Sequence, residues 1–167
     1  MAQRALQTLA ASPALWAALF ATLGAALCPA LGTNTADAAE FRSTSEAAVL
    51  YDAPSIKSKA LYALGRDYPL EVIVNVEGWL KVRDAAGTVA WIEKRSVGDK
   101  RMLTVRGATA DVLAQPEASA AVVFKAEQNV LLELVDPSYS TTTPGWAKVR
   151  HRDGQTGYVK IAQVWGL

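Results

Sequence analysis

The apolar residues of this chain follow one pattern at its start and another over the rest. Residues 14–27 are almost all apolar, and the only charge before them is the cation Arg4. Small residues follow and end in the run Ala-Asp-Ala-Ala at residues 36–39. A cation, an apolar run and an Ala-x-Ala site in this order are typical of a secretory signal peptide. We therefore expect residues 1–39 to be a helical signal peptide that is cleaved at this site.

The same segment has two other interpretations. The apolar run approaches the ~20 residues that span a bilayer, so an uncleaved membrane anchor is the alternative. Pro13, Pro29 and Gly32 interrupt helical structure around the run and favour cleavage. A lipid anchor on Cys28 is disfavoured, because Leu27 stands where lipoprotein signals have a small residue. Cleavage would leave a chain with no cysteine, no membrane span and a periplasmic or secreted location.

From residue 40 onward the pattern is that of short strands. Residues 70–76 and 130–135 are rich in apolar and β-branched side chains, which favours strands. Residues 79–83 alternate strictly, so Leu80 and Val82 are predicted to face one side. Trp79, Lys81 and Arg83 are predicted to face the other. Gly- and Asp-containing turns follow this strand and its later counterpart, which predicts hairpins. The sequence thus predicts an all-β protein built of small barrels.

The two halves of this region repeat each other. Pro54 and Pro116 lie in matching segments 62 residues apart, and Trp79 and Trp146 lie in matching segments 67 residues apart. The difference places five extra residues in one loop of the second unit, within residues 136–144. We predict that residues 138–143 form an exposed loop, in which Tyr139 either rebuilds a groove or fills space. The predicted domains are residues 40–99 and 100–167. The segment between them is too short for a free linker, so we expect the two barrels to touch.

Composition excludes several classes of function. The chain has 167 residues with 17 Lys+Arg against 16 Asp+Glu, a net charge of +1 that gives no electrostatic footprint for nucleic acid. One His and one Cys cannot form a structural zinc site or a disulfide within the chain. We predict no metal and no cofactor.

The repeated motif resembles a known family. Gly-Trp-x-Lys-Val-Arg at residues 78–83 and 145–150, with a Gly-containing turn and then Trp-Ile or Tyr-Val, resembles the bacterial SH3-like (Src-homology-3-like) domain. Residues 49–55 resemble the opening strand and turn of that family. The resemblance covers residues 47–97 and 110–164. It implies tandem small barrels in an exported protein, binding cell-wall material or other proteins and often appended to wall hydrolases.

The resemblance implies that such domains accompany wall hydrolases. These enzymes use either a Cys nucleophile with a His base or a His-rich zinc site. Neither set is present, because the one histidine, His151, lies between Arg150 and Arg152 beside a turn and is predicted to be an ordinary surface residue. The carboxylates are scattered along the chain. We therefore expect a protein that is not an enzyme and has no catalytic residues.

The tryptophans are the better candidates for function. Trp91 and its counterpart Tyr158 are predicted to pack in the cores, and Trp165 to cover a barrel end. Trp79 shares its strand face with two cations, so we expect its indole to be at least half exposed. The corresponding set in the second unit is Trp146, Lys148 and Arg150.

An exposed indole beside long basic side chains can stack on sugars or peptide planes while the cations attract carboxylates. The alternative is that the Lys and Arg stems simply cover the indole. The resemblance adds Tyr51 to the first site, whereas the second unit has Leu113 at that position. The predicted ligand-binding residues are Tyr51, Trp79, Lys81, Arg83, Trp146, Lys148 and Arg150.

Three hypotheses follow for function. The first is recognition of peptidoglycan, with Tyr51 and Trp79 as the stacking surface. The second is a protein–protein adaptor that binds a peptide of an envelope partner through the same groove or through a strand edge. The third is a regulatory or structural domain pair whose aromatic residues all lie in the core.

Overall fold

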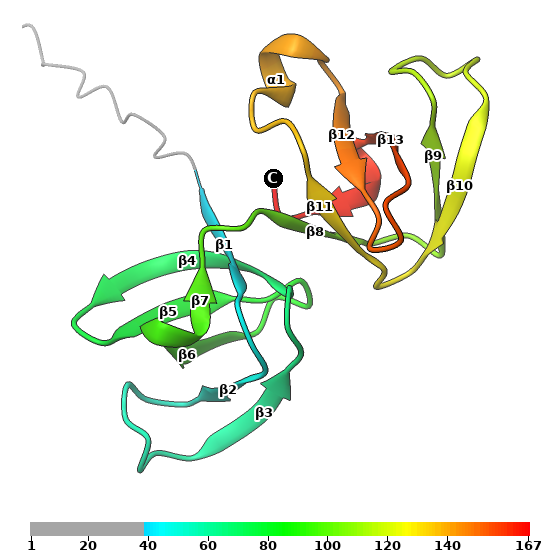
Figure 1. The fold of residues 1–167 in the computed structure, drawn as a ribbon. Coiled ribbons are helices and arrows are strands. Elements are labelled where there is room, and N and C mark those ends of the chain that lie inside the picture. The colour runs from blue at the N-terminus through cyan, green and yellow to red at the C-terminus, as the bar shows by residue number, and fades with distance from the viewer. Residues whose placement is uncertain (1–38) are drawn as a thin grey trace, which may run out of the picture. The chain divides into compact units, whose positions relative to one another are not determined.

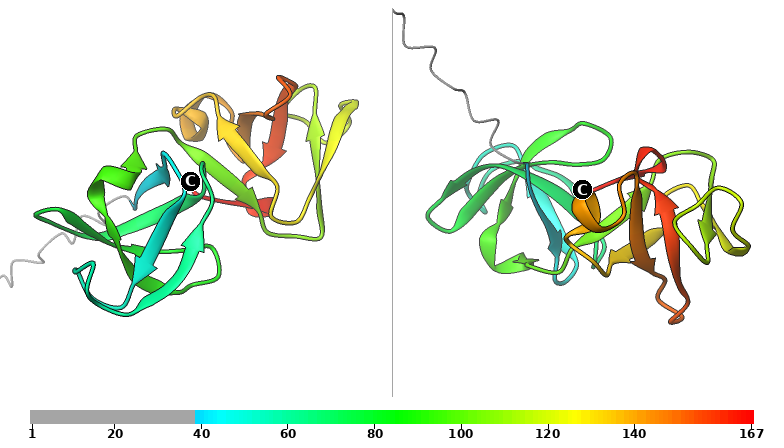
Figure 2. Two further views of the ribbon diagram at one scale, coloured as in Figure 1. Left: turned by 60° about the horizontal axis from the view of Figure 1, so that its bottom comes forward. Right: turned by 90° about the horizontal axis from the view of Figure 1, so that it is seen from above.

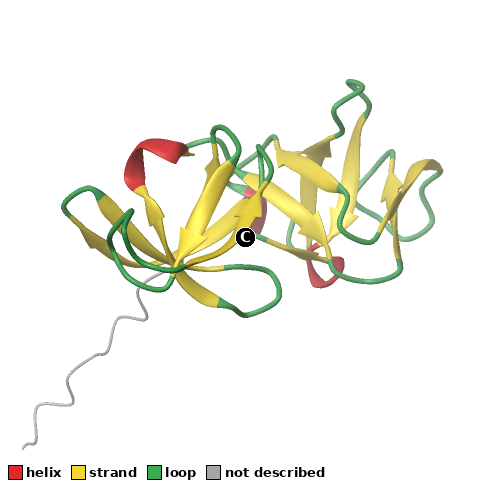
Figure 3. Ribbon diagram, turned by 90° about the horizontal axis from the view of Figure 1, so that it is seen from below, coloured by secondary structure: helices red, strands yellow, loops and turns green. Residues whose placement is uncertain are grey.

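The computed structural model describes residues 39–167, so the predicted signal peptide lies outside the described residues. The described part is almost entirely strands, with one short α-helix and two 3-10 turns (Figures 1 and 3). Its strands form two seven-stranded antiparallel sheets, one in each half, and the strands of each half curl around a separate core (Figure 2). The predicted all-β class with two tandem barrels is confirmed.

The first sheet has the strand order β3-β2-β6-β5-β4-β1-β7. Its elements are β1 (Glu40–Thr44), β2 (Ala48–Tyr51), β3 (Ala60–Leu64), β4 (Pro69–Val76), β5 (Trp79–Arg83), β6 (Val89–Glu93), the 3-10 turn η2 (Lys94–Ser96) and β7 (Val97–Gly98).

The second sheet repeats this topology in the order β10-β9-β13-β12-β11-β8-β14. Its elements are β8 (Met102–Val105), β9 (Thr109–Leu113), β10 (Val122–Glu127), β11 (Leu131–Leu134), α1 (Tyr139–Thr142), β12 (Trp146–Arg150), β13 (Thr156–Lys160), the 3-10 turn η3 (Ile161–Gln163) and β14 (Val164–Trp165). Even the turns before β4 and β11 match, because Asp67 and Asn129 both have a φ of 65°.

The structure confirms the alternation of inward and outward side chains predicted for the central hairpins. Leu80 and Val82 of β5 are 1% and 0% exposed, while Trp79 and Lys81 point to the outer face. The turn that leads into this strand needs Gly78, whose φ of 74° is in the left-handed region that other residues avoid. The side chains that face inward therefore determine the barrel, and the side chains that face outward remain available for other contacts.

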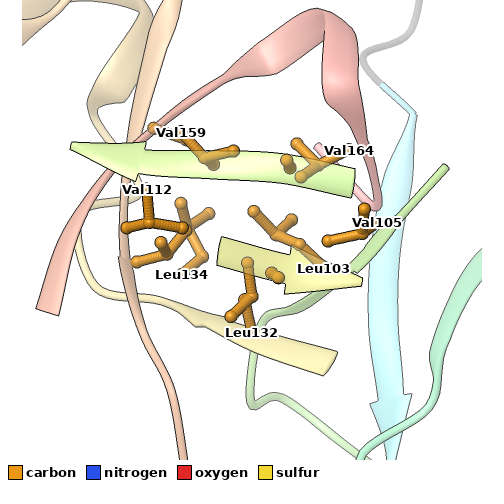
Figure 4. Close-up of a cluster of buried hydrophobic side chains, with 11 residues drawn as sticks. Leu103, Val105, Val112, Leu132, Leu134, Val159 and Val164 are labelled. Carbon is orange, nitrogen blue, oxygen red and sulfur yellow. The ribbon is translucent and has the colours of Figure 1, made fainter. Parts of the chain in front are cut away.

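Each barrel has its own apolar core. The core of the second barrel is drawn in Figure 4, where aliphatic side chains from β8, β9, β11, β13 and β14 point toward one another. Residues labelled there include Leu103, Val112, Leu132 and Val159, all 0% exposed. No tryptophan belongs to either buried cluster in the part of the chain that is described. The hypothesis that all the aromatic residues are core residues is therefore wrong.

The two barrels contact each other, as the short connection predicted. Phe41 of β1 packs edge-on against Trp165 of β14, with ring centroids 5.2 Å apart. The guanidinium of Arg101 lies 5.7 Å from the Phe41 ring, and its Nη2 donates a hydrogen bond of 3.0 Å to the carbonyl oxygen of Gly166. Trp165, predicted to cover a barrel end, thus has Phe41 of the first barrel as an aromatic neighbour.

The longer loop of the second barrel is more ordered than expected. Residues 139–142 form the helical turn α1, and Tyr139 packs against the core of its barrel. The carboxylate of Asp136 accepts hydrogen bonds from the hydroxyl of Thr142 at 2.7 Å and the backbone N–H of Ser138 at 2.8 Å, which lower the pKa of Asp136. The Tyr139 ring therefore fills space beside the barrel, which is one of the two roles predicted for it, while residues 140–142 of the loop are exposed.

Candidate functional site

The outer face of the first barrel carries three aromatic side chains on adjacent strands, which we call the aromatic face: Tyr51, Trp79 and Trp91. Tyr51 of β2 is the register partner of Trp91 of β6, and β6 pairs in turn with β5, which carries Trp79. The rings of Tyr51 and Trp79 meet edge-to-face with centroids 5.6 Å apart. All three side chains are partly buried. The structure thus brings together the two aromatic residues predicted for the first site and adds a third.

The positions of the tryptophans correct two predictions. Trp91 and Tyr158 are not core residues, because alternation along β6 and β13 gives the inward positions to small and aliphatic neighbours such as Ile92 and Val159. Trp79 and Trp146 are less than half exposed, since neighbouring side chains cover part of each indole.

The predicted cations are already engaged with groups of the protein. Lys81 lies opposite Trp91 and its Nζ is 5.8 Å from the indole centroid. The guanidinium of Arg83 forms a 2.8 Å ion pair with Glu71 on the neighbouring strand. The second barrel repeats both arrangements, with Lys148 5.9 Å from the ring of Tyr158 and Arg150 3.9 Å from Glu133. These cations therefore contact neighbouring side chains of the outer face and do not extend freely into solvent.

The corresponding face of the second barrel is different. Leu113 occupies the position of Tyr51, so Trp146 has no aromatic partner like the one that Trp79 has. Trp146 is instead the register partner of Lys160, whose Nζ lies 5.7 Å from its ring centroid. In the first barrel the same register position opposite Trp79 is occupied by Glu93, which pairs with Arg95 at 2.8 Å. The second indole is covered by a cation and the first is not.

Sequence reasoning missed Glu93 and Lys160. Their role depends on cross-strand register, because each lies directly opposite a tryptophan on the neighbouring strand. The 67-residue repeat contained the signal, since it aligns these two residues with each other. Extending the repeat through the end of the hairpin would have shown a charge reversal beside equivalent tryptophans.

A second difference lies beside the hairpin turns. The carboxylate of Asp84, which is 4% exposed, accepts hydrogen bonds from the hydroxyl of Tyr62 and from the backbone N–H of Thr88, the latter at 2.7 Å. Burial and the bond to Asp84 raise the pKa of the Tyr62 phenol to about 12. The second barrel has Phe124 and His151 at these two positions, with ring centroids 5.6 Å apart.

Tyr68, the residue before β4, packs against the first core. Burial, followed by the nearby charge of Asp84, raises the pKa of its phenol. Across residues 39–167, no three His, Cys, Asp or Glu side chains gather as metal ligands do. No helix in the same range is long and apolar enough to cross a membrane.

Comparison with known proteins places this geometry in context. The family model of the bacterial SH3 domain matches the chain twice, over residues 44–99 and 106–166. The chain is similar to the solved structure of NlpC2 from Trichomonas vaginalis, with 19% identity, a TM-score of 0.33, and coverage of 75% of this chain and 46% of that one. It is also similar to an NlpC/P60 family protein from Bacillus cereus ATCC 10987, with 13% identity, a TM-score of 0.34, and coverage of 75% of this chain and 56% of that one. The chain thus spans about half the length of these two proteins. No protein with a curated function matches it.

Proposed function

Since the chain belongs to the bacterial SH3 domain family and carries two copies of that domain, we propose that it is an exported, non-catalytic binding protein of the cell envelope that recognises peptidoglycan. The observation that carries the proposal is the aromatic face, above all the edge-to-face pair of Tyr51 and Trp79. Partly exposed aromatic rings offer apolar area at low entropic cost and stack on sugar rings or peptide planes. The location is the periplasm or the exterior, reached by way of the predicted signal peptide.

The two barrels take unequal parts in this proposal. The first barrel is the binder, because its Trp79 is next to Tyr51 and opposite an acidic residue. The second barrel contributes less, because Lys160 covers Trp146 and Leu113 replaces the tyrosine. Trp79 and Trp146 therefore form a matched pair for experiment, since they occupy the same place in the same motif.

The test is co-sedimentation of residues 39–167, which contain both sheets and both cores, with purified peptidoglycan. Trp79→Ala is expected to weaken retention about 30-fold, since an aromatic side chain at the centre of a binding surface contributes about 2 kcal/mol. Trp146→Ala is the control and should change retention less than about twofold. Circular dichroism and thermal melting confirm that both variants fold. Equal losses in the two variants, or no retention of the unaltered protein at low salt, would refute the proposal.

A second candidate is an adaptor that binds a peptide of an envelope protein, and one observation favours it. Pairing with β1 ends at Val72, so residues 73–76 of β4 have no strand on that side within the described chain. Ile73 and Val76 of this edge are 41% and 39% exposed. An extended peptide can add to such an edge. This candidate predicts capture of an envelope protein that is abolished by Val74→Pro and unaffected by Trp79→Ala.

A further inference from the structure

A cleft of about 440 Å³ lies where the two barrels meet. Its walls come from the turn before β4, from the connection between the barrels, and from β11, β12 and the turn that follows β12. The charged residues that line it are Arg66, Asp67, Lys100, Glu133, Arg150 and Arg152. Its volume falls within the range of pockets that bind small ligands.

The cleft has more positive charge than its own carboxylates neutralise. Lys100 Nζ lies 3.3 Å from Asp67 and 3.8 Å from Glu133, so both carboxylates are engaged by one cation. Glu133 also has Arg150 at 3.9 Å. In the described residues, Arg66 and Arg152 form no ion pair, and both are exposed. A concave surface with an excess of one sign concentrates the field and attracts ions of the opposite sign.

This excess stands out because the rest of the molecule is nearly balanced. The whole chain has a net charge of +1. The cations predicted to attract carboxylates beside Trp79 are unavailable for that role, since Lys81 lies over Trp91 and Arg83 is paired with Glu71. The cleft, by contrast, holds two cations, Arg66 and Arg152, that form no ion pair within residues 39–167.

We propose that the cleft between the barrels is an anion site that binds the carboxylates of an acidic peptide. Arg66 and Arg152 supply planar forks of N–H donors, which match a carboxylate with two parallel hydrogen bonds. The aliphatic side chains of Val130 and Leu131 line the same cleft and can contact the rest of a peptide. Resting on the proposed function, the ligand would be the peptide part of the cell wall, while the aromatic face binds a separate portion.

The experiment uses residues 39–167 and two synthetic peptides. The probe is acetyl-Ala-Ala-Glu-Ala with a free carboxyl terminus, and its neutral counterpart has Gln for Glu and an amidated terminus. Binding is measured by calorimetry at about 10 mM salt, where the Debye length is about 30 Å. The acidic peptide is expected to bind at least about tenfold more tightly than the neutral one, because hydrogen bonds to charged groups are the stronger class.

The double variant Arg66→Gln and Arg152→Gln should weaken binding of the acidic peptide about tenfold or more. Both side chains are exposed and unpaired, so the fold is expected to survive. The matched control is Lys57→Gln with Arg106→Gln, which removes the same charge from exposed positions outside the cleft and should leave binding within about twofold. Equal effects of the two double variants would overturn the proposal. Saturable binding of inorganic phosphate without binding of the acidic peptide would overturn it as well.

His151 gives an independent readout, since it lines the cleft and is the only histidine of the chain. Binding of the acidic peptide in the cleft should change the NMR chemical shifts of the His151 imidazole, and the double cleft variant should abolish that change. Failure here is distinguishable from failure of the proposed function. Loss of wall retention in Trp79→Ala with unchanged peptide binding in the cleft variant would retain wall recognition and reject the anion site. The opposite result would retain the anion site and reject wall recognition.

Discussion

The two barrels share a topology and differ in the surface that the same hairpin presents. In the first barrel Trp79 packs edge-to-face on Tyr51 and lies opposite Glu93. In the second, Trp146 lies under Lys160, and Leu113 takes the place of the tyrosine. The two surfaces thus differ at two positions: an acidic residue opposite the tryptophan is replaced by a lysine that covers the indole, and a tyrosine is replaced by a leucine.

This difference shows that the inward positions of these strands form the core, whereas the outward positions determine the surface. Val82 and Val149, which point inward at equivalent places, are both 0% exposed. The outward positions are free to diverge because barrel closure does not depend on them. Two copies of one barrel can therefore keep the same core and present different outer surfaces.

The largest expected effect concerns the cores. Leu80 of the first barrel is 1% exposed and corresponds to Ala147 of the second, which is 0% exposed. Leu80→Ala places in the first core the residue that the second core has at this position. In the second core the rings of Phe124 and Tyr139 pack against the buried cluster, and among the described residues the first core has no equivalent of Tyr139. We expect the free energy of unfolding to fall by about 2–5 kcal/mol, as measured by urea denaturation.

Ile56→Ala is the matched control for this variant, because Ile56 is 65% exposed and should change stability by less than about 0.5 kcal/mol. A loss of similar size in both variants would show that burial of Leu80 in the first core does not account for its contribution to stability.

The next effect concerns Tyr62 and its counterpart Phe124. Tyr62→Phe copies the second barrel and leaves the buried carboxylate of Asp84 without the phenol as donor. We expect a loss of about 1–3 kcal/mol at neutral pH in urea denaturation. Tyr158→Phe is the control, since its ring lies on the outer face beside Lys148, and it should be nearly neutral.

The same residue gives a dependence on pH. The pKa of Tyr62 is about 12 in the folded protein, above its ordinary value of 10.0. A group whose pKa is raised on folding contributes stability fully below its unfolded pKa and loses that contribution as the pH rises through the folded value. Stability attributable to Tyr62 should therefore be present below pH 10 and disappear between about pH 10 and 12. An unchanged difference between the wild type and Tyr62→Phe across this range would contradict the assignment.

The smallest effect concerns the cation over Trp146. Lys160→Ala should uncover the indole and lower stability by about 0.5–1 kcal/mol, the usual contribution of an exposed cation–π contact. NMR of the Trp146 indole N–H with a soluble paramagnetic probe measures the exposure. Glu93→Ala is the counterpart in the first barrel and should leave the Trp79 indole signal nearly unchanged. Equal changes at the two indoles would remove the distinction between the covered and uncovered surfaces.

Much of the fold could be predicted because it depends on local pattern. Strict alternation from Trp79 to Arg83 and the turn glycines fix a hairpin within a short stretch of sequence. The repeat then carries the same assignment to the second barrel. Tyr139 was harder, because its helical turn is stabilised by Asp136 and by packing on a core made from distant strands.

The candidate site was only partly predictable. Tyr51 and Trp79 were expected together, and they are in contact. The partners of Lys81 and Arg83 could not be derived from their own strand, since Trp91 and Glu71 lie on the two neighbouring strands. The cleft between the barrels depends on tertiary contacts at the junction, which neither the repeat nor alternation encodes.

The position of β1 has a consequence for how the first barrel forms. This strand lies between β4 and β7, and its last residue, Thr44, pairs with Val97 near the end of the domain. The barrel can therefore close only when residues 97–98 are available to pair with β1, at the opposite end of the domain sequence. Closure through such distant pairings is characteristic of folding in milliseconds to seconds. Until β1 and β7 have paired, the inner faces of the other strands stay open to water, so the last strand of the domain completes the burial of a core that the earlier strands build.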